Sequence, residues 1–153
     1  MEATRESREA GASALAQERM LRLSRIYDAF ARADDDALLA EVVEEFVFHA
    51  ATGRRIGRTE PYVGAEGLTE YLADARELWL DVRLTPQEYR ESLDRMLVRG
   101  RVWARDHDGT VLDSPVIWIW TFEGTLPIEC DVIEPGEGLP ATAPAAGWAR
   151  VGP

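Results

Sequence analysis

Residues 95–134, RMLVRGRVWARDHDGTVLDSPVIWIWTFEGTLPIECDVIE, decide the fold class. Apolar and polar side chains alternate along this stretch, and two short groups that contain Gly and acidic residues, at 106–110 and 123–124, interrupt the alternation. A period of two is typical of β-strands, and groups of this kind favour tight turns. The stretch therefore predicts three antiparallel strands joined by hairpins, at about 95–105, 111–122 and 125–134.

The rest of the chain adds a fourth strand and places helices before the sheet. Val82 and Leu84 alternate with polar residues from Asp81 onward. Apolar residues recur at helical spacing in two earlier segments, and the acids 34–36 are good N-caps for a short helix between them. We expect helices at about 14–33, just after 36, and 64–80, a short strand at 46–49 and a loop at 51–61. Helices followed by an antiparallel meander predict an α+β fold, with about three helices across a strongly curved sheet that forms a cone around a pocket.

Length and composition indicate one domain. The chain has 153 residues, of which 46% are hydrophobic, and this excludes a wholly disordered protein. We expect the domain at 14–134, after a flexible N-terminus at 1–13 and before a flexible Pro/Gly/Ala-rich tail at 135–153.

Charge and cysteine content exclude several classes of partner. The chain carries 17 basic residues, all of them Arg, and 28 acidic residues, for a net charge of −11. Nucleic acids and anionic membranes would be repelled, so neither is expected as a partner. Cys130 is the single cysteine and the N-terminus is no signal peptide, which predicts a cytoplasmic protein. The two histidines are far apart in no metal-binding pattern, so we expect neither a metal nor another cofactor.

The last hairpin assigns side chains to the two faces of the sheet. If Glu123-Gly124 is a two-residue loop, Trp118 faces Glu129 and Val116 faces Asp131. One face then holds both carboxylates together with Val116, Trp118 and Trp120, and the other face holds Ile117, Ile119, Ile128 and Cys130. A three-residue loop would reverse this assignment. We expect the carboxylates to face the pocket, because an acid among indole rings has a raised pKa that suits acid–base catalysis.

The preceding hairpin leaves two registers open. A three-residue loop at 107–109, with Gly109 left-handed, turns the apolar set inward: Met96, Val98, Gly100, Val102 and Ala104. A two-residue Asp-Gly turn would instead place Arg99 beside Trp118, inside the pocket. We favour the first register because it buries the apolar side chains and leaves the arginines in water.

From about Leu21 to Glu134 the chain resembles the SnoaL-like polyketide cyclases, within the superfamily shaped like nuclear transport factor 2. The stretches that carry the resemblance are IYDAFARADDDALLAEVVEEFVFHA, YVGAEGLTEYLADARELW, DRMLVRGRV and PVIWIWTFEGTL. The resemblance implies a cone-shaped α+β barrel, often dimeric through the outer face of its sheet, with an acid–base Asp on the last strand that falls at Asp131. The cyclases also place a His on the strand before it, where this chain has Trp118 or Ile117. The superfamily includes isomerases, dehydratases, epoxide hydrolases and members without known catalysis.

Together these features predict a cofactor-free enzyme that binds an apolar, polyketide-like or polycyclic small molecule. The reaction would move protons beside a carbonyl, in a cyclisation, isomerisation or dehydration. Asp131 is the expected catalytic acid–base, with His49 or Glu129 as its partner. The expected substrate-binding residues are Tyr27, Met96, Val116, Trp118 and Trp120. The alternative is a non-catalytic ligand-binding or dimeric assembly module. A homodimer is expected in either case, because the apolar strip Ile117, Ile119, Ile128 and Cys130 would otherwise be exposed.

Overall fold

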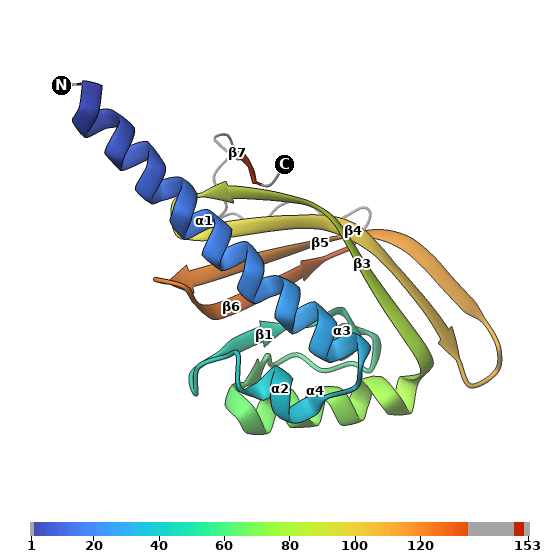
Figure 1. Cartoon of the computed structure of the whole chain (residues 1–153). Helices are drawn as coiled ribbons and strands as arrows, with labels where there is room; N and C mark the ends of the chain where they lie inside the picture. Colours follow the sequence, from blue (N-terminus) through green and yellow to red (C-terminus); the bar gives the residue numbers. More distant parts are fainter. Residues whose placement is uncertain (1, 135–148, 152–153) are drawn as a thin grey trace.

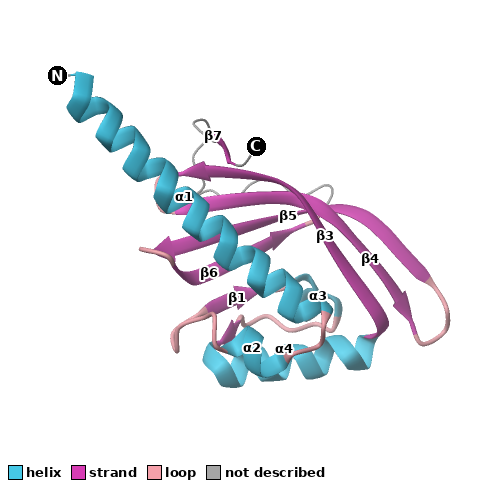
Figure 2. Ribbon diagram, in the orientation of Figure 1, coloured by secondary structure: helices cyan, strands magenta, loops and turns pink. Residues whose placement is uncertain are grey.

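A computed structural model describes residues 2–134 and 149–151 of the chain. Four helices lie on one side of a single sheet (Figures 1 and 2). They are α1 (Glu2–Ala31), α2 (Asp35–Leu39), α3 (Ala51–Arg55) and α4 (Gly64–Leu78). We call the sheet face that they cover the inner face and the opposite one the outer face. None of the described helices is both long and apolar enough to cross a membrane.

The sheet is mixed and open. Its strands are β1 (Val47–His49), β2 (Tyr62–Val63), β3 (Trp79–Ser92), β4 (Arg95–Asp106), β5 (Val111–Glu123), β6 (Leu126–Ile133) and β7 (Ala149–Val151), in the order β2-β1-β6-β5-β4-β3-β7. All neighbours are antiparallel except β1 and β6, which are parallel. The α+β class and the four-stranded meander are therefore confirmed. The expected strongly curved barrel is not found, because β2 and β7 remain as edges and helices, rather than further strand pairing, cover the inner face.

Several helix and strand boundaries differ from the sequence prediction for local reasons. Helix α1 begins at Glu2, earlier than the expected residue 14, because residues 2–13 favour helix through Ala, Glu and Arg while lacking an apolar period. Helix α3 lies inside the predicted loop, since five residues are too few for a period to emerge. The cap of α2 matches the prediction, as the Asp34 carboxylate accepts a hydrogen bond from the Ala37 amide at 3.1 Å. Of the predicted tail, residues 149–151 form β7 and pair with β3, and residues 135–148 lie outside the described residues.

The three-residue hairpin between β4 and β5 is confirmed. Gly109 has a φ of +88°, and the Asp106 carboxylate accepts hydrogen bonds from the Asp108 and Thr110 amides, both at 2.9 Å. Val98 then pairs with Trp118 and Arg99 with Ile117, so the even-numbered side chains of β4 face inward. Arg99, Arg101 and Arg105 consequently lie on the outer face.

Two apolar clusters reflect the two faces. The main core fills the space between α1, α4 and the inner face, and contains among others Leu23, Leu68, Met96, Val98, Trp118 and Trp120. A smaller cluster lies on the outer face and consists of Leu97, Ile119 and Ile133, with Ile117 packed against it. The inner face therefore holds the space in which a site can form.

Gly100 allows β3 and β4 to approach each other where β3 changes register. A Cβ atom at this position would lie 2.2 Å from the Thr85 carbonyl oxygen, and the irregularity in β3 falls directly after, between Pro86 and Glu88. Any side chain larger than hydrogen would force the two strands apart. Since Val102 and Ala104 lie just beyond on β4, the glycine also helps to shape the inner face.

We expect Gly100→Ala to lower the free energy of unfolding by about 1–3 kcal/mol, because the added methyl group overpacks against backbone that cannot rotate away. Urea titration measures this change. Gly109→Asn serves as the control, since nothing lies within 4 Å of a Cβ there and Asn tolerates a positive φ. Equal losses in the two variants would contradict the packing argument.

Candidate functional site

A β-bulge at Ile128 decides which side chains face the site. Glu123 pairs with Leu126 and Phe122 with Pro127, whereas the next residue, Thr121, pairs with Glu129. Ile128 is therefore an extra residue with no partner on β5. The hairpin loop is Gly124-Thr125 rather than Glu123-Gly124. This difference moves the partner of each β5 residue by two positions along β6, so by itself it would leave every side chain on its expected face.

The bulge reverses the expected assignment of every later residue of β6. Trp120 pairs with Cys130, Ile119 with Asp131 and Trp118 with Val132. Paired residues share a face, so Cys130 and Val132 join the tryptophans on the inner face, whereas Glu129 and Asp131 lie on the outer face. The prediction that the two carboxylates face the pocket is wrong, as is the placement of Cys130 in an outer apolar strip.

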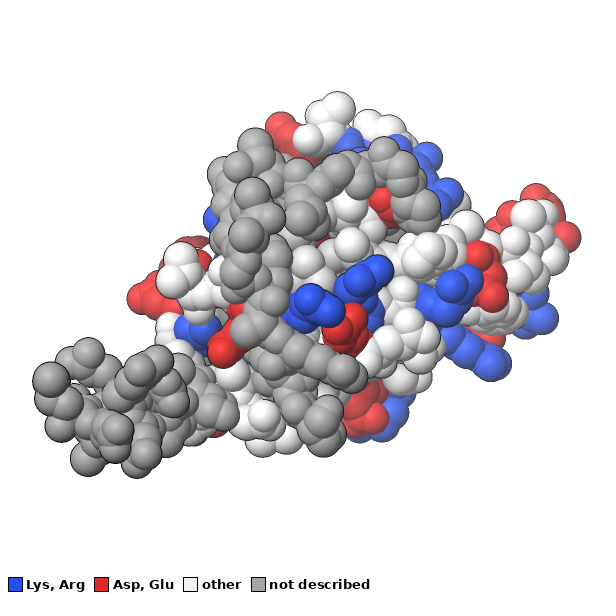
Figure 3. All heavy atoms as spheres, turned by 90° about the horizontal axis from the view of Figure 1, so that it is seen from above, with Lys and Arg blue, Asp and Glu red and all other residues white. Residues whose placement is uncertain are grey.

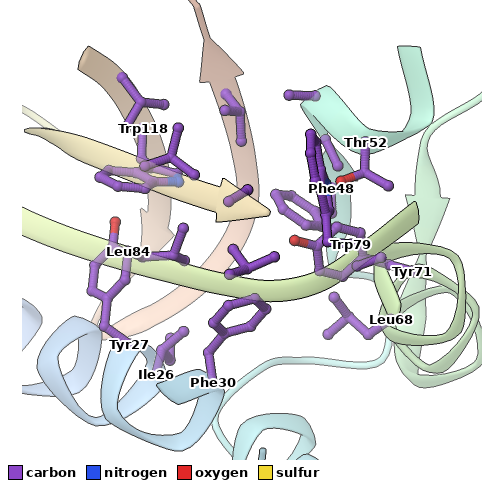
Figure 4. A pocket seen from close by; sticks show the side chains of 18 of the residues that line it. Ile26, Tyr27, Phe30, Phe48, Thr52, Leu68, Tyr71, Trp79, Leu84 and Trp118 are labelled. Carbon is purple, nitrogen blue, oxygen red and sulfur yellow. The ribbon is translucent and has the colours of Figure 1, made fainter. Parts of the chain in front are cut away.

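The pocket itself lies between the helices and the inner face, with a cavity of about 110 Å³ (Figure 4). Four of the predicted substrate-binding residues line it: Tyr27, Val116, Trp118 and Trp120. Met96, the fifth, is fully buried in the core and does not reach the cavity. Further walls come from Phe30, Phe48, Leu68, Leu84 and other apolar side chains. The binding role of the four lining residues stays a prediction.

Tyr27 provides a polar atom at one end of the pocket. Its ring contacts those of Trp118 and Trp120 edge-on, with centroids 5.1 and 6.1 Å away. The Trp120 indole Nε1–H donates a hydrogen bond to the Tyr27 hydroxyl oxygen at 3.1 Å. Burial raises the pKa of Tyr27 well above its ordinary value, so the hydroxyl keeps its proton at neutral pH. Because the oxygen accepts from Trp120, the hydroxyl proton takes no part in that bond and can be donated to another acceptor.

Other polar side chains gather at the opposite end, where Figure 4 shows Thr52, Phe48, Tyr71 and Trp79 together. Burial raises the pKa of Tyr71, which therefore also stays protonated. Arg55 and Glu134 line the pocket as well and form an ion pair, with Arg55 Nη2 3.2 Å from Glu134 Oε1. Their side chains are 36% and 28% exposed, so the pocket reaches solvent beside them.

Sequence reasoning missed Arg55 and Glu134. Arg55 ends the short helix α3, which has no apolar period, and Glu134 follows the last residue of β6. The only sequence feature that could have indicated Arg55 was the Gly-Arg-Arg run at 53–55, but this run is typical of an exposed loop. Only the packing of α3 beside the end of β6 brings the two side chains together.

The three predicted catalytic residues do meet, but on the outer face. Strand β1 runs parallel to β6 and places His49 beside Asp131. His49 Nε2 lies 3.2 Å from Glu129 Oε2 and 3.8 Å from Asp131 Oδ1. Burial, with a smaller contribution from Glu129, raises the pKa of Asp131, while His49, Arg95 and Arg54 oppose the shift. None of His49, Glu129 and Asp131 lines the pocket, so a role for them on a pocket ligand is not supported by the geometry.

The outer face carries both signs of charge. Figure 3 looks onto this side of the sheet and shows acidic and basic side chains next to one another. Arg101 pairs with Asp113 at 3.1 Å and Arg90 with Glu88 at 2.8 Å. Leu97, Ile119 and Ile133 are 6%, 2% and 6% exposed in the single chain, so the apolar strip offers less free surface than the sequence predicted. The homodimer through this face stays a prediction.

Comparisons with known proteins agree with this architecture. A family model described as a SnoaL-like domain matches residues 23–126. No curated protein matches the chain. Among solved structures, an ntf2-like protein of unknown function from Burkholderia pseudomallei superposes with a TM-score of 0.70 at 20% identity, over 76% of this chain and 90% of that one.

Two further solved structures have names that refer to chemistry. TerC, co-crystallised with polyporic acid, gives a TM-score of 0.70 at 21% identity over 76% of this chain and 91% of its own. A proposed polyketide cyclase from Xanthomonas campestris pv. campestris gives 0.65 at 16% identity, over 77% and 90%. At these identities the similarities show the fold.

The raised pKa of Asp131 predicts how stability depends on pH. The pKa of Asp131 in the folded chain lies above the ordinary value of 3.8. At a pH between these two pKa values, the folded chain therefore binds more protons than the unfolded chain does. The free energy of unfolding contributed by this group therefore falls as the pH rises from about 3.8 through the folded pKa. Asp131→Asn removes this decrease. The difference in the free energy of unfolding between variant and parent should therefore favour the variant more at pH 7 than at pH 3.5.

Urea unfolding at intervals between these pH values measures the difference. Asp113→Asn, which removes an exposed carboxylate of the outer face, is the matched control and should leave the pH dependence near that of the parent. A parental pH dependence in Asp131→Asn would show that the group is not destabilised by burial.

Proposed function

The chain belongs to the SnoaL-like domain family, and from this premise we propose that its inner-face pocket binds a small, mostly apolar molecule with one ring and one hydrogen-bond-accepting oxygen. The observation that carries the proposal is the Tyr27 hydroxyl, which lines the pocket among aromatic rings and accepts a hydrogen bond from Trp120. An apolar wall with a small number of placed polar groups is the usual composition of a small-molecule site.

The cavity volume supports a ligand of modest size. An engineered protein cavity of about 150 Å³ accommodates benzene. The 110 Å³ found here is of the same order, so a single ring fits more readily than the polycyclic molecule expected from the sequence. The opening beside Arg55 and Glu134 gives substituents on that ring a path to solvent.

The tyrosine–tryptophan pair favours an oxygen acceptor on the ligand. The Trp120 N–H polarises the Tyr27 hydroxyl and makes its proton a better donor. A carbonyl or ether oxygen at this end of the pocket would accept that proton, whereas a hydrocarbon would leave it without a partner.

Binding, rather than acid–base catalysis, is the function that the geometry supports best. Of the described residues that line the pocket, Glu134 alone is a carboxylate, and it is paired with Arg55. Asp131, Glu129 and His49 lie on the other side of the sheet. Among the described residues, cyclisation, isomerisation or dehydration would have only this ion-paired carboxylate as a proton acceptor in the pocket.

A pair of matched ligands tests the proposal. Acetophenone and cumene have similar shapes, but only the first has an oxygen acceptor. We expect calorimetry to show binding of both, with acetophenone tighter by about 2- to 12-fold, the equivalent of a net hydrogen bond of about 0.5–1.5 kcal/mol. Tyr27→Phe should remove this preference.

Tyr89→Phe is the control, since Tyr89 packs against the core without lining the pocket and should leave the preference intact. If neither ligand binds the parent protein, the pocket does not have the proposed function. If Tyr27→Phe keeps the parental preference, the donor is another group.

A further inference from the structure

Arg55 is the one cation among the described residues that line the pocket. Helix α3 directs Ala51, Thr52 and Arg55 toward the cavity, because residues one turn apart share a helix face. The adjacent Arg54 does not line the pocket, and its Nη2 donates a hydrogen bond to the Val132 carbonyl at 2.9 Å. The chain has a net charge of −11, so a cation that lines an apolar pocket contrasts with the overall acidic composition.

The Arg55 guanidinium has more N–H donors than its described contacts use. Its contact with Glu134 uses a single nitrogen, Nη2, which lies 3.2 and 3.3 Å from the two carboxylate oxygens. Its central carbon lies 5.7 Å from the Trp79 ring centroid, a cation–π contact that orients the group. A guanidinium has five N–H donors in a planar fork. The interactions described for Arg55 leave the donors of Nε and Nη1 available to a ligand.

The ion pair with Glu134 does not prevent such binding. The two side chains are 36% and 28% exposed, and ion pairs in such positions contribute little to stability. A second carboxylate can therefore share Arg55 with Glu134 or replace it. Because this end of the pocket reaches solvent, an anionic group bound there keeps part of its hydration while the rest of the ligand is buried.

We propose that the pocket selects small aromatic carboxylates, with the ring among the aromatic side chains, the carboxylate on Arg55 and any acceptor oxygen on the far side of the ring at Tyr27. This inference rests on the binding function proposed above and names the ligand class. A planar carboxylate matches the guanidinium fork with two parallel hydrogen bonds, which a neutral amide of the same shape cannot reproduce.

Phenylacetate and phenylacetamide, which have nearly the same shape and differ in charge, test the inference by calorimetry at pH 7.5. We expect the parent protein to bind phenylacetate about tenfold more tightly, the range of a charge-assisted hydrogen bond. Arg55→Gln should reduce this ratio to near one. Glu134→Gln should raise it, because the competing carboxylate loses its charge. The two variants move the ratio in opposite directions, which a general loss of folding would not do.

Arg76→Gln is the matched control, since Arg76 forms an exposed ion pair with Asp35 and does not line the pocket; the ratio should stay parental. A ratio near one in the parent, with both compounds bound, overturns the inference and leaves the proposed function standing. A parental ratio in Arg55→Gln, or tighter binding of phenethylamine than of phenylacetate, also overturns it. Failure of every compound to bind, acetophenone included, contradicts the proposed function and with it this inference.

Discussion

The β-bulge at Ile128 determines the chemistry of both faces of the sheet. Side chains of a strand alternate between faces, so one extra residue moves every later side chain of β6 to the other side. Cys130 and Val132 thereby join Trp118 and Trp120 against the helices, and Glu129 and Asp131 turn outward. The inner face becomes almost wholly apolar as a result. The pocket can stay apolar only because this bulge removes two carboxylates from it.

Helix α1 completes the pocket, and a buried arginine sets its position. Arg19 is 5% exposed, and its guanidinium donates hydrogen bonds to the Gly124 carbonyl at 2.8 Å and the Leu93 carbonyl at 2.9 Å. These carbonyls belong to the turns after β5 and β3, so a single side chain holds two hairpins against one helix. Tyr27 lies about two turns further along α1, roughly 12 Å at the usual helical rise. The bond between Tyr27 and Trp120 therefore forms between two elements whose relative position is already determined.

These placements separate two kinds of chemistry that the sequence suggested would coincide. The inner face offers aromatic walls, the Tyr27 donor and the Arg55–Glu134 pair, a set that suits recognition of a small ring-containing molecule. The outer face offers His49 between two carboxylates, on a surface with ion pairs and a small apolar cluster. One fold can host many unrelated functions, so the content of the pocket is the feature that distinguishes among the possible functions.

Local patterns were sufficient for much of the fold. The three strands within 95–134, the acids 34–36 before a helix and the Gly109 turn each depend on neighbouring residues, and each was predicted correctly. The register between β4 and β5 that burial chemistry favoured, out of the two left open, is also the one observed. Val116, Trp118 and Trp120 could be named as pocket residues because they share that inward face, and Tyr27 because it lies on the apolar face of the first helix.

The tertiary structure alone decided the faces of Glu129 and Asp131, the parallel pairing of β1 with β6, and the approach of α3 to the end of β6. The bulge cannot be recognised in the sequence of β6, because Ile128 fits the alternation of apolar and polar residues along that strand. Its position appears only in the pairing of β6 with β5 across the hairpin and with β1, which lies far earlier in the sequence. The ion pair of Arg55 with Glu134 joins residues 79 positions apart, and no local period connects them.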